Sequence, residues 1–309
     1  MRLAAVLFFA CGVVAQETPV FRTDVSLVHV DAEVTAADGR ILTGFFKEDF
    51  RVLDEGKEQP ILHFSAGDEA LDLILLFDVS GSMRPKVQEV AAAAREGVRE
   101  LRPGDRVAIM VFNSRSRLLL RFTDDLEEVR RSIQEEVMSL PFGGSTFIQS
   151  AVSDAARRLM RQPRTERRRA ILIITDDFGQ RTRKESSVVR ELWEADALLT
   201  ALVVRSKAVE TVRTIGTIMH PYLIGLQAGV KGITEKTGGD FIHAGDAGAD
   251  FQESMRRIRN RYSIYYAMPD AKPQTHRLVQ VELSADAAKR HPKARVRART
   301  GYVTPAKPQ

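Results

Sequence analysis

Three separated stretches of the chain carry short, oxygen-bearing side chains after an apolar run or a glycine turn. They are residues 78–82 (DVSGS), 143–146 (GGST) and 175–177 (TDD). Hydroxyl and carboxylate oxygens suit a hard divalent cation such as Mg²⁺, which takes octahedral oxygen ligands and keeps several waters. The three stretches therefore predict a cation site, provided that the fold brings them together.

The chain around these stretches alternates between continuous apolar runs and helical patterns. Uninterrupted apolar runs are typical of strands buried on both faces of a parallel sheet. They occupy residues 71–77, 107–112, 170–175 and 198–204, with a shorter run at 241–242. Amphipathic helical spacing occupies residues 87–101, 126–137, 148–160, 186–195 and 249–261. The pattern predicts a doubly wound, mostly parallel α/β domain, in which ligands bind at the carboxyl ends of the strands.

The segments on either side of this domain have the residue pattern of antiparallel strands. Alternating or β-branched patterns occupy residues 25–35, 50–54, 262–266, 276–283 and 294–299. We expect both flanks to pack together as one small β-sandwich, because the two ends of the α/β domain leave it close to each other. The expected organisation is a signal peptide at 1–15, an N-terminal β module at 21–66, the α/β domain at 70–262, a C-terminal β segment at 263–303 and a flexible tail at 304–309.

The N-terminal residues predict export. Arg2 precedes an apolar run over residues 3–10, and small residues follow, with cleavage expected after Ala15. The run is too short to span a bilayer, so we expect a secreted, periplasmic or cell-envelope protein without a transmembrane segment. Cys11, the only cysteine, would leave with this segment. The less favoured alternative is a lipoprotein, in which Cys11 is acylated and kept at a membrane surface.

Composition excludes several other classes of protein. Hydrophobic residues make up 44% and charged residues 28% of the chain, which is ordinary globular usage. The formal net charge is +5, and the basic excess lies in residues 152–170 and 286–309. Neither basic stretch is interleaved with aromatic residues, so we expect no nucleic-acid partner. The lone cysteine excludes disulfides and cysteine-ligated metals from the mature chain.

The order and spacing of the polar stretches resemble a known metal site. The set is similar to the metal-ion-dependent adhesion site (MIDAS) of von Willebrand factor type A domains, and the resemblance covers residues 71–262. The flanks resemble a bacterial secreted family related to these domains, of an acidobacterial type. Members begin with a strand module that contains a stretch like residues 48–56 (EDFRVLDEG) and close with one like residues 299–302 (RTGY).

The resemblance implies a role for each of five residues. Ser80 and Ser82 would bind Mg²⁺ or Mn²⁺ directly through their hydroxyls, and Thr146 would bind in the ligand-engaged state. Asp78 and Asp176 would act largely through water. The sixth position would then be filled by an exposed Asp or Glu of a protein partner. Neutral hydroxyl ligands leave more of the ion's positive charge available to that carboxylate.

Two departures from the family pattern affect this expectation. Asp177 stands where the family usually has glycine, and its charge would weaken binding of anionic partners. Ser145 competes with Thr146 as the hydroxyl ligand, and Thr146 is preferred because it keeps the family's spacing. In related domains the last helix moves when the site binds its ligand. The apolar stripe from Phe251 to Tyr262 is therefore expected to be core, with a sliding surface as the alternative.

The expected function is adhesion-type protein binding through the metal, without catalysis. The chain lacks a G-x-S-x-G nucleophile elbow and the lysine of a P-loop, and no general base stands beside the proposed metal. A metal-dependent hydrolase is therefore the least favoured function. The main alternative is a scaffold module of the cell envelope that assembles through its β-sandwich and holds a structural metal or none. The sequence does not indicate an oligomeric state.

Overall fold

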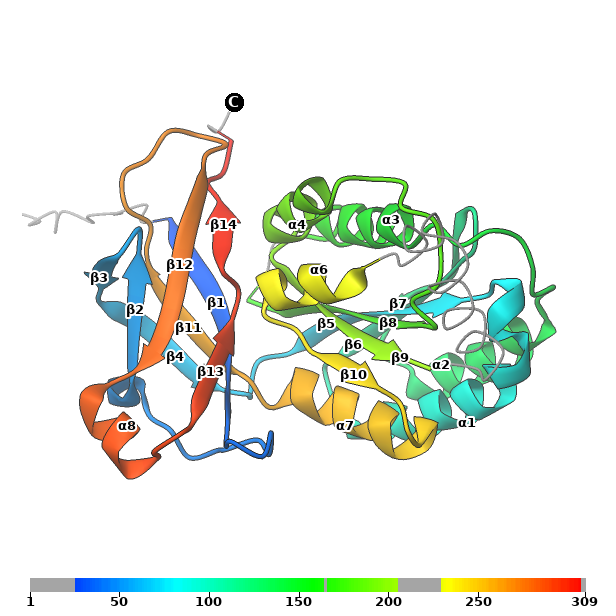
Figure 1. Cartoon of the computed structure of the whole chain (residues 1–309), viewed down its shortest axis with the longest axis horizontal. Helices are drawn as coiled ribbons and strands as arrows, with labels where there is room; N and C mark the ends of the chain where they lie inside the picture. Colours follow the sequence, from blue (N-terminus) through cyan, green and yellow to red (C-terminus); the bar gives the residue numbers. More distant parts are fainter. Residues whose placement is uncertain (1–25, 164–165, 205–228, 307–309) are drawn as a thin grey trace, which may run out of the picture.

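The computed structural model describes residues 26–163, 166–204 and 229–306. Two units lie side by side in it, a β-sandwich and an α/β unit (Figure 1). The predicted signal peptide, its cleavage after Ala15 and the alternative role of Cys11 lie outside the described residues, as do residues 307–309 of the predicted tail. Within the described ranges, none of the helices has the length and apolar character needed to cross a membrane.

A six-stranded sheet forms the centre of the α/β unit. Its strands are β5 (Leu71–Asp78), β6 (Arg106–Phe112), β7 (Ser116–Thr123), β8 (Arg168–Thr175), β9 (Ala197–Val203) and β10 (Phe241–His243). Their order is β10-β9-β8-β5-β6-β7, and every neighbouring pair is parallel except β6 and β7. The mostly parallel α/β fold predicted from the sequence is confirmed. The antiparallel edge strand β7 was not predicted.

Helices cover both faces of the sheet, which explains the continuous apolar runs. All eight residues of β5 are buried, and the six apolar ones alternate between two apolar cores. One face packs against α1 (Val87–Gly97), α2 (Leu126–Ser132) with its π-helical continuation Ile133–Val137, and α7 (Ala247–Arg259). The other face packs against α3 (Ile148–Met160), α4 (Glu185–Glu194) and α6 (Val230–Thr237), of which α6 was not predicted.

The last helix of the α/β unit, α7, packs closely against α1. A Cβ atom at Gly97 would lie 2.2 Å from a ring carbon of Phe251, so only glycine admits this ring between the helices. Phe251, Met255 and Ile258 are all buried on this face. Tyr262 does not continue the helical stripe, because it starts a strand and joins the core of the sandwich.

The sandwich consists of two four-stranded antiparallel sheets that mix segments from both ends of the chain. The first has the order β13-β1-β11-β4, with β13 (Arg295–Ala298), β1 (Leu27–Thr35), β11 (Tyr262–Ala267) and β4 (Ile61–Ala66). The second has the order β14-β12-β2-β3, with β14 (Gly301–Val303), β12 (His276–Leu283), β2 (Phe50–Asp54) and β3 (Lys57–Gln59). Both sheets contribute to a shared apolar core. The two short helices of this unit are η1 (Lys47–Asp49) and α8 (Ala285–Arg290).

The α/β unit is inserted between two neighbouring strands of the sandwich. The chain leaves the sandwich after β4 and returns at β11, and these strands pair with each other, Ala66 opposite Tyr262. Because β11 begins at Tyr262, the α/β unit ends one residue before the boundary that we placed from the sequence.

Buried polar groups join the two units. Arg168, at the start of β8, is fully buried; its Nε lies 2.7 Å from Oδ1 of Asp31 in β1. The same guanidinium donates hydrogen bonds to the carbonyls of Ile258 (2.7 Å) and Arg259 (3.0 Å), which end α7. One side chain therefore connects the central sheet, the last helix and the sandwich.

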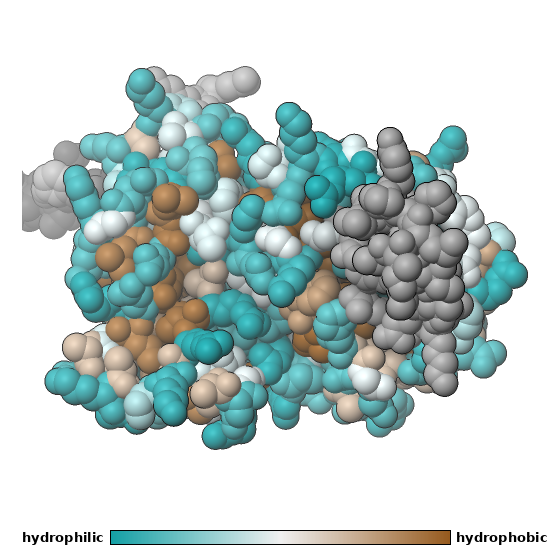
Figure 2. Space-filling model, in the orientation of Figure 1, coloured by the Kyte–Doolittle hydropathy of each residue, from teal (hydrophilic) through white to brown (hydrophobic). Residues whose placement is uncertain are grey.

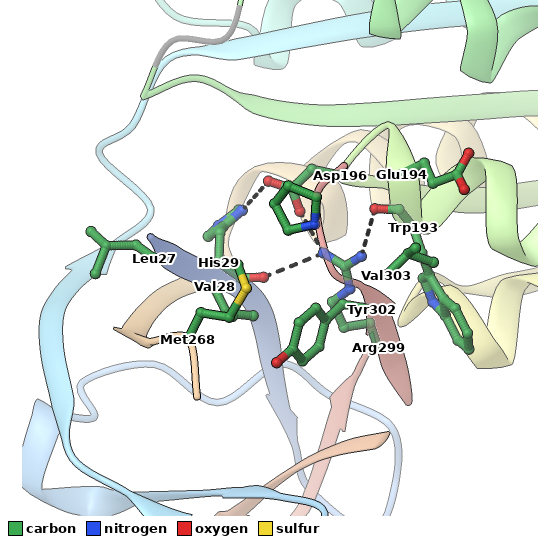
Figure 3. Close-up of a pocket in the computed structure, with 11 residues that line it drawn as sticks. Leu27, Val28, His29, Trp193, Glu194, Asp196, Met268, Arg299, Tyr302 and Val303 are labelled. Atoms are coloured by element: carbon green, nitrogen blue, oxygen red, sulfur yellow. Dashed lines mark hydrogen bonds and ion pairs between the residues drawn. The ribbon is translucent and has the colours of Figure 1, made fainter. Parts of the chain in front are cut away.

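A second polar cluster of the interface surrounds a small cavity of about 80 Å³, in which His29 from the sandwich faces Asp196 from the α/β unit (Figure 3). Nδ1 of His29 lies 3.0 Å from Oδ2 of Asp196, and Arg299 forms an ion pair with the other oxygen of that carboxylate. Arg299 also donates a hydrogen bond to the carbonyl of Trp193. Burial alone would lower the pKa of His29, but the carboxylates of Asp196 and Asp31 outweigh it and raise that pKa to about 10.

Candidate metal centre

The proposed site lies where the order of strands reverses. β5 is central, with β8 on one side and β6 on the other, so the loops that follow β5 and β8 begin next to each other. In open α/β sheets this switch point at the carboxyl ends of the strands is the usual place for a ligand. Asp78 ends β5 and Thr175 ends β8, which places the first and third polar stretches at this edge.

Asp78 is held in place by hydrogen bonds to both carboxylate oxygens. Oδ1 accepts a bond from the backbone N–H of Ser80 (2.9 Å), and Oδ2 accepts one from the hydroxyl of Thr175 (2.7 Å). The side chain is buried, with 3% exposed. Burial and the nearby charge of Asp176 raise the pKa of Asp78 to about 7. A bound cation would offset this repulsion, because it supplies the opposite charge that two buried carboxylates need.

The hydroxyls of Ser80 and Ser82 lie close together beside this carboxylate. Their Oγ atoms are 3.1 Å apart; Ser80 is 1% exposed, whereas Ser82 is partly exposed. Adjacent ligands in an octahedron with Mg²⁺–oxygen distances near 2.0–2.1 Å are separated by about 2.9 Å. The spacing of the two hydroxyls therefore fits neighbouring positions around one Mg²⁺.

The second polar stretch is tied to the first by backbone and side-chain hydrogen bonds. The N–H of Gly143 donates to the carbonyl of Val79 (3.0 Å). Asn113, which follows β6, donates a hydrogen bond from its side-chain Nδ2 to the carbonyl of Gly143 (2.9 Å). The backbone carbonyl of Asn113 accepts a hydrogen bond from the N–H of Phe147 (3.0 Å). These bonds fix the glycine turn against both neighbouring strand ends.

Thr146 lies against the loop that follows the third stretch, whereas Ser145 is exposed to solvent. Thr146 is 6% exposed, and its carbonyl accepts a hydrogen bond from the N–H of Gln180 (3.0 Å). The backbone at Gly179 passes close to Thr146, since a Cβ atom at position 179 would lie 2.5 Å from the carbonyl oxygen of Thr146. The buried position of Thr146 favours it over the exposed Ser145 as the hydroxyl ligand.

The two aspartates that follow β8 differ in orientation. Asp176 is fully buried, and its Oδ1 accepts the N–H of Phe178 (3.0 Å). Asp177 has a left-handed backbone, with φ of 54°, which accounts for a preference for glycine at this position. Its Oδ1 accepts the N–H of Val230 (3.3 Å) at the start of α6. The carboxylate therefore contacts the positive end of that helix, an arrangement that reduces its influence on an anionic partner.

The candidate site differs in its ligand types from a metal site built of carboxylates or histidines. Across the described ranges, no group of three or more His, Cys, Asp or Glu side chains is placed to hold a metal ion. The predicted ligands are instead three hydroxyls, backed by the two buried carboxylates of Asp78 and Asp176. Oxygen ligands of this kind suit Mg²⁺ or Mn²⁺ rather than a soft metal.

Three residues with a structural part in this site were given no role of their own from the sequence, although Thr175 belongs to the third polar stretch. They are Thr175, which orients Asp78, Asn113, which holds the glycine turn, and Gly179, which lets the third loop approach Thr146. Thr175 and Asn113 each stand at the carboxyl end of a predicted strand, and that position was the available signal. Nothing in the local sequence marks Gly179, because its role depends on a loop more than thirty positions away.

Comparison with known proteins gives a family match and several fold matches. Residues 73–180 match the model of the von Willebrand factor type A domain, and no curated protein matches the sequence. The solved structures include the conserved hypothetical protein BatB from Bacteroides thetaiotaomicron, with 16% identity over 61% of this chain and 97% of that chain and a TM-score of 0.46. Proximal thread matrix protein 1 from the mussel byssus, with a zinc-occupied MIDAS motif, matches with 16% identity, 67% and 50% coverage and a TM-score of 0.49. The manganese-loaded TRAP protein of Plasmodium vivax matches with 13% identity, 76% and 98% coverage and a TM-score of 0.45.

Proposed function

Because this chain contains a von Willebrand factor type A domain, we propose that it is an adhesion-type binding protein. A divalent cation, Mg²⁺ or Mn²⁺, at the edge of the α/β sheet would recognise an acidic side chain of a partner protein. The observation that carries the proposal is the pair of serine hydroxyls 3.1 Å apart beside the fixed carboxylate of Asp78.

Each residue of the site has a separate task in this proposal. Ser80, Ser82 and Thr146 offer neutral oxygens to the ion, and Asp78 and Asp176 supply the negative charge behind it. When bound, the ion supplies positive charge with a coordination position open to a carboxylate. Hydrogen bonds to Asp78 keep its carboxylate in one orientation, so the protein contributes a preformed cradle.

The proposal is tested by removing the two hydroxyls. We expect a Ser80→Ala, Ser82→Ala double variant to lose the calorimetric heat of Mg²⁺ binding. We expect it to keep its fold, because Ser80 precedes the short 3-10 helix Gly81–Lys86 without a side-chain capping bond and Ser82 lies in the first turn of that helix. A matched control is Ser186→Ala, which removes an exposed hydroxyl from α4 in the same unit. Mg²⁺ binding that survives in the first variant, or that is absent from the unaltered protein, would refute the metal site.

A second candidate function is assembly with a partner through the β-sandwich. The exposed apolar side chains of the sandwich favour this function. Phe46 is 70% exposed and Leu278 is 55% exposed, and Leu27 and Leu62 are exposed as well. Figure 2 shows apolar atoms grouped on the visible side of the sandwich, among polar ones. Capture of a partner that is unaffected by EDTA and is lost in a Phe46→Ser, Leu278→Ser variant would favour this scaffold function over metal-dependent binding.

We also propose that the chain acts in the cell envelope or outside the cell. The support is the sequence of residues 1–15, with its basic start, apolar run and small residues before the cleavage site. Mass spectrometry of the mature N-terminus tests this. An N-terminal residue at position 16 supports cleavage after Ala15, a lipidated Cys11 supports the lipoprotein alternative, and an intact Met1 contradicts both.

A further inference from the structure

In the part of the chain that the structure describes, the segments that border the candidate metal centre carry exposed basic side chains and no exposed acidic ones. The segments that border the candidate site itself are residues 79–86, 113–115, 138–147 and 176–184. Their exposed charged residues are Arg84, Arg115, Arg181 and Lys184. The loop after β10, farther along the same edge, carries the exposed Asp246. Acidic residues make up 41 of the 309 residues of the chain, so their absence from the exposed part of the four bordering segments is a local feature.

The acidic residues of the four bordering segments are buried. Asp176 and Asp177 are at most 5% exposed, and Asp78 at the end of β5 is similarly covered. Two other basic residues of these loops already have acidic partners nearby, Lys86 with Glu89 and Arg183 with Glu191. The charge that these loops present to solvent is therefore positive.

The three exposed arginines each belong to, or directly follow, backbone that is hydrogen-bonded to the site. Arg84 donates a hydrogen bond to the carbonyl of Phe142 (2.5 Å), next to the glycine turn. Arg115 closes the hairpin at Asn113, since its N–H donates to Oδ1 of Asn113 (3.2 Å). Arg181 directly follows Gln180, whose N–H bonds to Thr146. Each arginine therefore lies near the proposed metal by chain connection.

We infer that the partner presents a run of acidic residues rather than a single one. This inference rests on the proposed function: one carboxylate would bind the metal, and its neighbours would pair with Arg84, Arg115 and Arg181. We call these three residues the basic rim. Exposed ion pairs are weak and screened by salt, so each contributes about two- to fivefold in affinity. Together they distinguish an acidic run from an isolated carboxylate.

Two fluorescent peptides of equal length test the inference by anisotropy in the presence of Mg²⁺. One is hexaglutamate, and the other has a single Glu in a Gln background. We expect hexaglutamate to bind about tenfold or more tightly at low salt, and the difference to shrink at high salt. Equal affinities for the two peptides at low salt would overturn the inference.

Variants separate the basic rim from the metal. Arg115→Gln, Arg181→Gln should weaken hexaglutamate binding about tenfold and leave Mg²⁺ affinity and single-Glu binding unchanged. The control Arg40→Gln, Arg295→Gln removes two exposed arginines of the sandwich and should have no effect. An equal loss in the rim variant and the control would overturn the inference, because it would show an effect of net charge alone.

The two proposals fail in different ways. Hexaglutamate binding that persists in EDTA and is still weakened by the rim variant would support the basic rim. Absence of Mg²⁺ binding in the unaltered protein would overturn the metal proposal and leave the basic rim standing. An anionic polysaccharide, heparin, that displaces hexaglutamate and binds more tightly at equal charge would overturn the assignment of an acidic protein segment as the partner.

Discussion

Replacing Arg168 with methionine tests the connection between the two units. Methionine keeps a long apolar side chain in the buried space but removes the guanidinium. Three interactions are lost: the ion pair with Asp31 at 2.7 Å and the hydrogen bonds to the carbonyls of Ile258 and Arg259. The carboxylate of Asp31 then stays in the interface without its main cation.

The expected loss of stability follows from these contacts. Removing one partner of a buried ion pair costs about 3–5 kcal/mol, because the other charge stays buried. Asp31 retains His29, whose Nε2 lies 3.6 Å away, and the hydroxyl of Ser263 at 3.3 Å. We therefore expect a loss near the lower end, about 3 kcal/mol, which is a large share of the total of about 5–15 kcal/mol for a typical protein.

The only tryptophan of the chain provides the assay. Trp193 donates from Nε1 to the carbonyl of Lys236 (3.1 Å) and stacks on His276 of the sandwich, with ring centroids 4.7 Å apart. Its fluorescence during urea unfolding therefore reports on the interface. Arg158→Met is the matched control, because Arg158 is a partly exposed arginine of the same unit.

A double-mutant cycle that combines Arg168→Met with Asp31→Asn measures the interaction energy between these two side chains. If the ion pair matters as described, the double variant should lose much less stability than the sum of the two single losses. A loss below about 1 kcal/mol for Arg168→Met, or additive losses in the cycle, would refute the reasoning that this arginine connects the units.

Three further predictions concern single side chains. Gly179→Ala should weaken Mg²⁺ affinity about tenfold in calorimetry, because the added methyl group displaces Thr146, and unchanged affinity would contradict this packing. The pKa of His29 is raised to about 10 from an ordinary 6.5, so the stability from its charge is complete below pH 6.5 and is lost as the pH rises toward 10. The unfolding free energy from urea titrations should thus fall between pH 7 and 10, with a shallower fall in His29→Gln; parallel curves would contradict this. Asp177→Asn should leave Mg²⁺ affinity unchanged because the carboxylate faces α6, and a clear change would show that its charge reaches the metal.

Burial on both sides explains which parts of the fold could be predicted from the sequence. The strands β5, β6, β8 and β9 are buried on both faces, and such strands appear as unbroken apolar runs. Strand β7 lies at the edge with partly exposed residues, and its arginines interrupt the apolar pattern. Helix α6 is short and begins beyond residues 205–228, so its periodicity spans only two turns.

The candidate site divides in the same way. The hydroxyls and carboxylates could be named as candidate ligands from the sequence because their type and order carry the chemistry, and their role in binding a metal stays a prediction. Gly179 and Asn113 were not, because their contribution is a close approach or a hydrogen bond to a loop distant in sequence. The buried ion pair of Arg168 with Asp31 was also out of reach, since the two residues are 137 positions apart.

The insertion of the α/β unit between β4 and β11 has a mechanical consequence. A pulling force applied at the tip of the α/β unit can reach the sandwich only through the two covalent connections and the interface beside them. Both connections enter adjacent, paired strands, and β11 is a central strand of its sheet. Tension would therefore be shared by two tethers at one point, and the molecule would resist the load as a single stiff body without a linker that stretches first.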